Sequence, residues 1–130
     1  ISLADELEQS RSLLAANGIQ LDLHIENPVT VLTPASETML SLCVREAVTN
    51  IMKHSGAKTC DIVWTFNQNQ ACLRIKDDGN GIIRFSKGNG LHSIRERMEM
   101  LDGYAEFVVE PNGGTEIVCT LPIWKRGEER

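Results

Sequence analysis

The sequence predicts a two-layer α/β sandwich, in which a mixed and mostly antiparallel sheet carries about three helices on one face. Two observations support this fold class: segments of helical periodicity alternate with segments of strand periodicity, and most strands are joined in pairs by short turns. The chain has 130 residues, 42% of them hydrophobic, which is enough for one core. No internal repeat or linker is visible, so we expect a single domain over residues 1–130.

The first half of the chain is predicted to form a helix, a strand and a second helix. Residues 2–17 show an approximate leucine stripe and stop at an Asn-Gly pair, and residues 20–26 alternate as in a half-buried strand. After a turn-rich connection, residues 35–54 form the strongest predicted helix, with apolar residues at i, i+3, i+4 and i+7. The two apolar stripes consist of Leu3, Leu7, Leu13 and Leu14, and of Val44, Ala47, Val48 and Ile51.

The second half is predicted to form two β-hairpins, with a glycine-rich segment and a helix between them. Each hairpin consists of two apolar segments separated by a short run of turn residues. The expected ranges are 59–66 and 71–76 for the first hairpin, 77–90 for the glycine-rich segment, 91–101 for the helix, and 104–110 and 115–123 for the second hairpin. The charged tail after Trp124 is expected to fray.

The composition excludes several classes of partner. A net charge of −5 argues against nucleic acid, because phosphate backbones select basic surfaces. No apolar run approaches the ~20 residues that a membrane span needs, so we expect no direct membrane contact by this domain. The four cysteines are widely spaced, which favours buried, reduced thiols over a zinc site or a disulfide framework. The chain opens within a helical pattern without Met, so we expect it to be part of a longer protein.

A polar stripe on the predicted helix 35–54 is the first candidate site. Glu46, Thr49, Asn50 and Lys53 share one side of this helix, opposite the apolar stripe. The amide oxygen of Asn50 suits Mg²⁺ beside phosphate oxygens, and Lys53 is placed to contact a phosphate. Glu46 would act as a base or help to hold the metal through water. An ordinary solvated helix face shows the same pattern.

Two glycine-rich segments are the other candidates. Asp77-Asp78-Gly79-Asn80-Gly81-Ile82 follows a predicted strand, so that a carboxylate at the strand end can accept from an exocyclic amine while the glycines allow close approach. Lys87-Gly88-Asn89-Gly90-Leu91 precedes a predicted helix, and free N–H groups at a helix start favour phosphate. Each segment alone is also compatible with an ordinary turn or loop.

In this order and spacing, the three segments resemble the ATP-binding site of the GHKL superfamily. Residues 45–54 resemble its N box, residues 77–81 its first glycine box, residues 88–91 its second glycine box, and residues 112–115 its glycine–threonine motif. Within the superfamily, the string GxGLxxxRER at residues 88–97 is similar to that of sensor histidine kinases of the NarL/DesK/LiaS type. The resemblance implies the Bergerat (GHKL) fold.

The resemblance also implies a role for each matching residue. Asn50 would ligate Mg²⁺, Asp77 would accept the adenine amine, and Thr115 would lie near the adenine. Many kinases carry Asn where this chain has Glu46, so the resemblance assigns Glu46 no single role. The residues implied for binding ATP are Asn50, Lys53, His54, Asp77, Gly79, Gly81, Ile82, Lys87, Gly88, Asn89, Gly90, Leu91 and Thr115, with Asn50 and Glu46 for Mg²⁺ and for catalysis.

A protein-histidine kinase of this type would pass the γ-phosphate of ATP to a histidine on its dimerisation domain, and a response regulator would receive it next. None of the three histidines, His24, His54 and His92, matches the HD-like box of that domain. The resemblance therefore implies a cytoplasmic catalytic domain that is monomeric alone, binds ATP and does not phosphorylate itself. The whole protein would be a membrane-anchored homodimer.

Three other functions remain open at this point. The chain is also compatible with another GHKL ATPase of the gyrase, MutL or Hsp90 type, which Glu46 slightly favours. An anti-sigma serine kinase has a similar size, although the string Arg95-Glu96-Arg97 argues against it. A nucleotide-binding module without turnover is the third.

Overall fold

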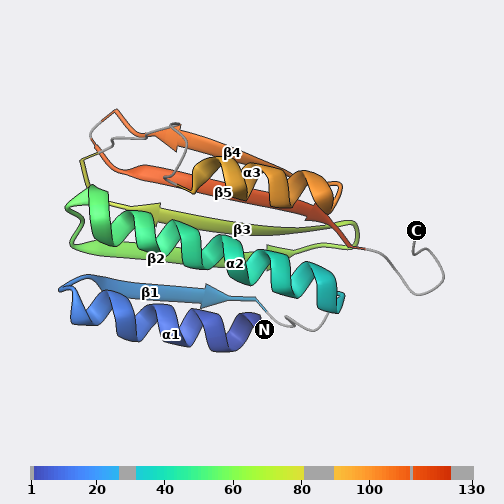
Figure 1. The fold of residues 1–130 in the computed structure, drawn as a ribbon, viewed down its shortest axis with the longest axis horizontal. Helices are drawn as coiled ribbons and strands as arrows, with labels where there is room; N and C mark the ends of the chain where they lie inside the picture. Colours follow the sequence, from blue (N-terminus) through green and yellow to red (C-terminus); the bar gives the residue numbers. More distant parts are fainter. Residues whose placement is uncertain (1, 27–31, 81–89, 112, 124–130) are drawn as a thin grey trace.

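Three helices cover one face of a five-stranded sheet in the computed structural model, which describes residues 2–26, 32–80, 90–111 and 113–123 (Figure 1). The strand order is β1-β2-β3-β5-β4; β1 and β2 are parallel, and every other neighbouring pair is antiparallel. The predicted sandwich is therefore confirmed. The strands are β1 (Gln20–Ile25), β2 (Thr59–Phe66), β3 (Gln70–Asp77), β4 (Tyr104–Val109) and β5 (Thr115–Pro122).

The helices α1 (Leu3–Ala16), α2 (Pro34–Asn50) and α3 (Leu91–Met100) lie side by side, with α2 in the middle (Figure 1). Side chains cap the first two helices, since Ser2 accepts from the N–H of Asp5 and Thr33 accepts from the N–H of Ser36. The predicted apolar stripe of α2 is confirmed, because all four of its residues are buried.

Alternation along β3 determines which side chains face the helices. Ala71, Leu73 and Ile75 are buried in the core, and Asp77 continues the same alternation at the end of the strand. The side chain of Asp77 therefore points toward the helical layer. This places a carboxyl group at the edge of the core between the sheet and the helices.

Three details of the prediction were wrong. The helix predicted over 35–54 is α-helical only to Asn50, and a π-helical turn, η2 (Ile51–Ser55), follows it before Gly56 takes a left-handed φ of 66°. A π-turn pairs each N–H with the carbonyl five residues back, so it widens the end of the helix. Leu13 is 47% exposed, because it lies outside the face of α1 that meets the sheet, and Cys72 is only half-buried.

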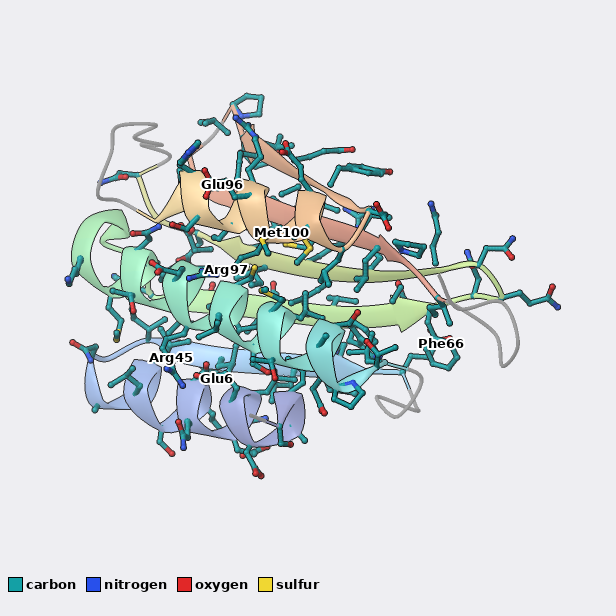
Figure 2. All side chains as sticks on the ribbon, turned by 45° about the vertical axis from the view of Figure 1, so that its right-hand side comes forward. Glu6, Arg45, Phe66, Glu96, Arg97 and Met100 are labelled. Atoms are coloured by element: carbon teal, nitrogen blue, oxygen red, sulfur yellow. The ribbon has the colours of Figure 1, made fainter. Side chains whose placement is uncertain are left out.

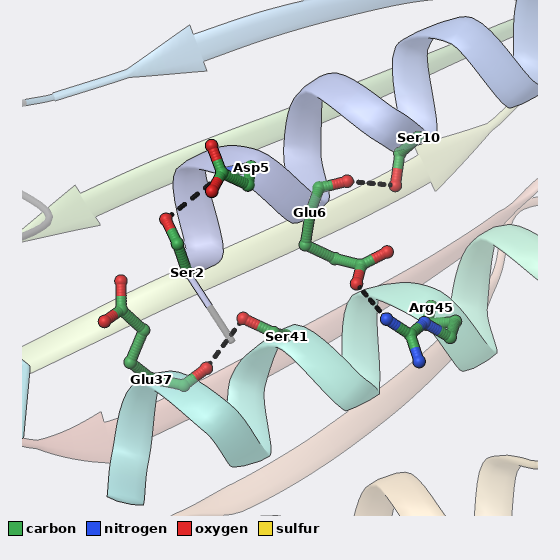
Figure 3. Close-up of polar contacts among 7 residues, drawn as sticks. All are labelled: Ser2, Asp5, Glu6, Ser10, Glu37, Ser41 and Arg45. Carbon is green, nitrogen blue, oxygen red and sulfur yellow. Dashed lines mark hydrogen bonds and ion pairs between the residues drawn. The ribbon is translucent and has the colours of Figure 1, made fainter. Parts of the chain in front are cut away.

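A buried carboxylate joins α1 to α2 (Figure 3). Oε1 of Glu6 lies 2.7 Å from Nη2 of Arg45, and the side chain of Glu6 is 6% exposed against 53% for that of Arg45. The hydroxyl of Ser10 donates to the backbone carbonyl of Glu6 one turn earlier. Because Glu6 is buried, its charge needs this partner.

Replacing Arg45 by Met is expected to lower the free energy of unfolding by about 1–2 kcal/mol, because it leaves the buried Glu6 carboxylate unpaired. Adding Glu6→Gln should recover most of this loss, since the buried charge is then removed. Urea unfolding of the single and double variants measures both effects. Equal stability of the Arg45→Met variant and the unsubstituted chain would show that the pair contributes nothing.

Candidate functional site

Asp77 lies at the carboxyl end of the central strand β3, between two neighbouring strands. Its Cα partners are Cys60 on β2 and Thr115 on β5. Directly opposed residues of an antiparallel pair project from the same face of the sheet. The fold therefore places Thr115 beside Asp77.

The carboxyl group of Asp77 is buried and only partly compensated. The residue is 6% exposed, and its Oδ1 accepts a hydrogen bond of 2.8 Å from the N–H of Gly79. Burial raises the pKa of Asp77, the Gly79 contact opposes this increase, and the nearby charge of Asp78 adds to it. A buried acceptor of this kind suits a specific hydrogen-bond donor on a ligand.

Asp78 has a different, structural role. Its side chain is exposed, and Oδ1 accepts from the N–H groups of Lys58 and Thr59 at 2.8 and 2.9 Å. These two backbone hydrogen bonds lower the pKa of Asp78. Asp78 thus fixes the start of β2 against the end of β3, and this arrangement favours Asp77 as the ligand-binding carboxylate.

The stabilising effect of Asp78 is expected to depend on pH. Its folded-state pKa is lowered, so its ionised form stabilises the fold above the unfolded pKa of about 3.9, and this contribution is lost as the pH falls through the folded pKa. Asp78→Asn keeps the acceptor but loses the charge, so it should cost under about 1 kcal/mol at pH 7 and less in acid. Urea unfolding of the variant and of the unsubstituted chain, at pH 7 and in acid, measures the difference in stability between them. A difference that is the same at both pH values would contradict this account.

Two glycines of the second hairpin pack against the backbone at Asp77. A Cβ at Gly114 would overlap the carbonyl oxygen of Asp77, and one at Gly113 would lie 3.0 Å from the carbonyl oxygen of Gly79. Both glycines have φ near +90°, which other residues rarely adopt. The glycine–threonine segment therefore closes one side of the site by backbone contact.

Glu46 connects α2 to the start of α3. Its carboxylate lies directly beside Gly90, where a Cβ would overlap Oε2, and its Oε1 is 3.8 Å from Nη1 of Arg97. Arg97 also lies against the thiol of Cys43, whose pKa burial raises to about 11 and the arginine partly lowers. Asn50, half-buried, follows Glu46 by one turn of the same helix.

The first turn of α3 is the helix start that lies beside Glu46. Gly90 precedes the helix with φ +85° and provides no side-chain cap, and the carbonyl of Gly90 accepts from the N–H of Ile94. The first N–H groups of a helix have no acceptor within it, and they carry the positive end of the helix dipole. Leu91 is buried in the core, which anchors this turn.

These features lie at the same end of the sandwich. The end of α2, the end of β3, the start of α3 and the start of β5 come together at the left of the ribbon (Figure 1). The structure places Glu46 beside Gly90, and Asp77 beside Gly79 and Thr115. Asn50 is the last residue of α2, Leu91 is the first residue of α3, and the exposed Lys53 lies on the π-helical turn beyond Asn50. The predicted residues Gly81, Ile82, Lys87, Gly88 and Asn89, and the side chain of His54, lie outside the described residues.

The side chains near Gly90 fit Mg²⁺ better than a metal held by protein ligands alone. Among the described residues, no group of three or more His, Cys, Asp or Glu side chains is arranged to hold a metal ion. Mg²⁺ usually takes one or two protein oxygens, keeps several waters and binds phosphate oxygens of the substrate. Glu46 and Asn50 supply one carboxylate and one amide oxygen, one turn apart.

Arg97 is the residue that sequence reasoning did not assign. The string at residues 88–97 marked it as part of a family pattern but gave it no role, because its partner Glu46 lies 51 positions earlier in the numbering.

In the described part of the chain, no helix is both long and apolar enough to cross a bilayer.

Comparison with known proteins finds a matching family and similar relatives. Residues 35–125 match the family described as histidine kinase-, DNA gyrase B-, and HSP90-like ATPase. Two Bacillus subtilis (strain 168) proteins are similar: sensor histidine kinase YvfT is 32% identical over 98% of this chain and 34% of its own length, and sensor histidine kinase DesK is 34% identical over 94% and 33%. The chain thus spans about a third of these relatives.

Solved structures share the fold. The histidine kinase domain of the Erythrobacter litoralis EL346 blue-light activated histidine kinase has a TM-score of 0.75 at 16% identity, over 95% of this chain and 62% of that one. The ATP binding domain of PrrB from Mycobacterium tuberculosis has a TM-score of 0.71 at 22% identity, over 96% of each chain. At these identities the likeness concerns the fold alone.

Proposed function

Because the chain belongs to the family of histidine kinase-, DNA gyrase B- and HSP90-like ATPases, we propose that it is the ATP-binding catalytic domain of a sensor histidine kinase. The observation that carries the proposal is the buried Asp77 carboxyl beside Thr115, at the end of the sandwich where α3 begins. We propose that residues 1–130 act as one domain, which binds ATP together with Mg²⁺.

The adenine would bind at Asp77. Oδ1 is engaged by the N–H of Gly79, so the other carboxyl oxygen is the acceptor that we assign to the exocyclic amine. The close packing of Gly113 and Gly114 on the 77–79 backbone supports a flat, narrow site edge for the base, next to Thr115. Gly79 and Gly81 would allow the base to approach the chain.

The phosphates would bind where α2 meets α3. Gly90 and the first turn of α3 would present N–H groups, and Lys53, which is exposed on the turn beyond Asn50, would add a positive charge; Lys87, Gly88 and Asn89 precede Gly90 in sequence. Asn50, with Glu46 directly or through water, would hold the Mg²⁺. When bound, Mg²⁺ neutralises charge on the phosphate oxygens, and the residues of this chain position the γ-phosphate for attack.

The acceptor histidine would lie on the dimerisation domain of the same protein. Catalysis of phosphoryl transfer depends on positioning and charge neutralisation, which this chain supplies without a nucleophile of its own. We propose that the phosphorylated protein then serves a response regulator, and that this domain works in the cytoplasm as part of a homodimer with a membrane anchor. The similarity to YvfT and DesK supports this assignment.

Calorimetry of the 130-residue chain tests the binding proposal. We expect one saturable site for ATP that requires Mg²⁺ and weakens on addition of a chelator. We also expect no transfer of label from γ-labelled ATP to the chain. Absence of ATP binding would overturn the proposal, and label on His24, His54 or His92 would overturn the assignment of the acceptor to another domain.

One observation favours a second function, ATP hydrolysis with Glu46 as the base. The carboxylate of Glu46 lies beside Gly90 at the proposed phosphate end, where a base could activate water. Steady ATP hydrolysis by this chain, abolished by Glu46→Ala with ATP affinity retained, would support hydrolysis over transfer to histidine. Hydrolysis at the rate of a blank without protein would exclude it.

A further inference from the structure

Arg97 is placed between α2 and α3, at a position that the proposed site does not explain (Figure 2). Its side chain is 24% exposed, and its Nη1 atom is buried and has no hydrogen-bond partner among the described residues. The carboxylate of Glu46 lies 3.8 Å away, too far for a hydrogen bond but close enough for an ion pair. Burying part of a guanidinium costs free energy, and an attraction to the Glu46 carboxylate offsets this cost.

Glu46 is held between two groups of α3. Oε1 faces Arg97, while Oε2 lies against Gly90, so closely that a side chain at position 90 would overlap it. Gly90 is the residue before the first turn of α3 and leaves that turn without a side-chain cap. The negative charge of Glu46 is therefore fixed beside the helix start at which we have placed the phosphates.

Although Glu46 would help to hold Mg²⁺, its negative charge beside Gly90 would also repel the phosphates that we place there. Between partly buried groups, charges interact more strongly than in water, because the surrounding dielectric is lower. The guanidinium of Arg97 is the positive group that the structure places against Oε1 of Glu46. On the neighbouring position of α2, Arg45 points the other way, toward Glu6 of α1, so it does not serve this purpose (Figure 2).

We propose that Arg97 is a positioning residue for nucleotide binding, which holds Glu46 against Gly90 and compensates its charge, so that the triphosphate can bind at the start of α3. This inference rests on the proposed function. It gives a physical role to the last arginine of the string at residues 88–97. It also predicts that Arg97 matters only as long as Glu46 is charged.

Calorimetric titration with Mg-ATP tests this dependence in a double-mutant cycle. Arg97→Met should weaken binding about tenfold, because Glu46 then lacks the guanidinium that holds it against Gly90 and compensates part of its charge. Arg97→Lys retains a positive charge and should stay within about threefold of the unsubstituted chain. In a Glu46→Gln background, Arg97→Met should lower the affinity for Mg-ATP by less than about threefold, because no carboxylate remains at position 46 to be compensated.

Arg95→Met is the matched control, since it removes the same charge from the same helix. Arg95 stacks on the ring of Phe107, 5.1 Å from its centroid, on the side of β4 rather than α2. We expect this variant to bind Mg-ATP as the unsubstituted chain does. Thermal unfolding of each variant without nucleotide separates loss of fold from loss of affinity.

The outcomes distinguish the inference from the proposed function. An equal loss on Arg97→Met in both backgrounds, or an equal loss on Arg95→Met, would overturn the inference and leave ATP binding intact. If Arg97→Met does not fold, Arg97→Gln replaces it in both backgrounds, because this substitution also removes the charge of Arg97. No Mg-ATP binding by the unsubstituted chain would overturn the proposed function, and the inference with it.

Discussion

Asp77→Asn is expected to weaken Mg-ATP binding by about 100-fold without destabilising the chain. The Oδ1 of asparagine can keep the hydrogen bond from the N–H of Gly79, but an amide NH₂ then replaces the oxygen that we assign to the adenine amine. Two donors would face each other, and losing a hydrogen bond to a charged acceptor costs about 1.5–3 kcal/mol. Calorimetry with Mg-ATP measures the loss.

Stability should change in the opposite direction. Burial raises the pKa of Asp77, so ionising its carboxyl group opposes folding. The contribution of the neutral carboxyl group to stability is fully present below the unfolded-state pKa and is lost as the pH rises through the folded-state pKa. Asp77→Asn removes this cost, so the variant should be at least as stable as the unsubstituted chain at pH 7. Its advantage should disappear in acid.

Asp78→Asn is the control for this experiment, because Oδ1 of the neighbouring carboxylate accepts from the N–H groups of Lys58 and Thr59 at the start of β2. We expect its affinity for Mg-ATP to stay within about threefold of the unsubstituted chain. Equal affinities of the Asp77→Asn variant and the unsubstituted chain would contradict the adenine assignment.

Gly114→Ala is expected to lower the free energy of unfolding by about 2–4 kcal/mol and to weaken nucleotide binding. An alanine would have to adopt a φ of +88°, and its Cβ would overlap the carbonyl oxygen of Asp77, which is backbone and cannot move aside. Relief of this overlap requires β5 to shift away from the end of β3. Urea unfolding and calorimetry measure the two effects.

Gly18→Ala separates the two causes. Gly18 has a φ of +75°, but no atom lies within 4 Å of the position of its Cβ. This variant should therefore lose only about 1 kcal/mol, the cost of the left-handed backbone, and keep its affinity for Mg-ATP. A similar loss of stability in both variants would show that the contact with Asp77 has no energetic weight.

Local periodicity was sufficient to predict the layers of this fold. The i, i+3, i+4, i+7 spacing of apolar residues in α2 predicts a helix with one buried face, and all four residues are buried as expected. The alternation in the strands and the short turns between them likewise predicted the antiparallel pairs. The π-helical turn after Asn50 was not predictable in this way, because the sequence there continues a helical pattern.

Part of the candidate site was predictable from the sequence and part was not. Asp77 and Thr115 were predictable because motifs in the sequence mark them, and the sheet register then places them side by side. The contact between Glu46, Gly90 and Arg97 depends instead on how α2 packs against α3, which no local pattern specifies. The role that we infer for Arg97 therefore required the structure.

Backbone amide resonances of the isotope-labelled chain, followed during a Mg-ATP titration, test the central claim most directly. We predict saturable shifts that are largest at Asp77–Gly79, at Gly113–Thr115 and in the first turn of α3, because the base and the phosphates would contact these segments. Shifts that do not saturate, or that are confined to the opposite end of the sheet around His24 and Trp64, would contradict the account.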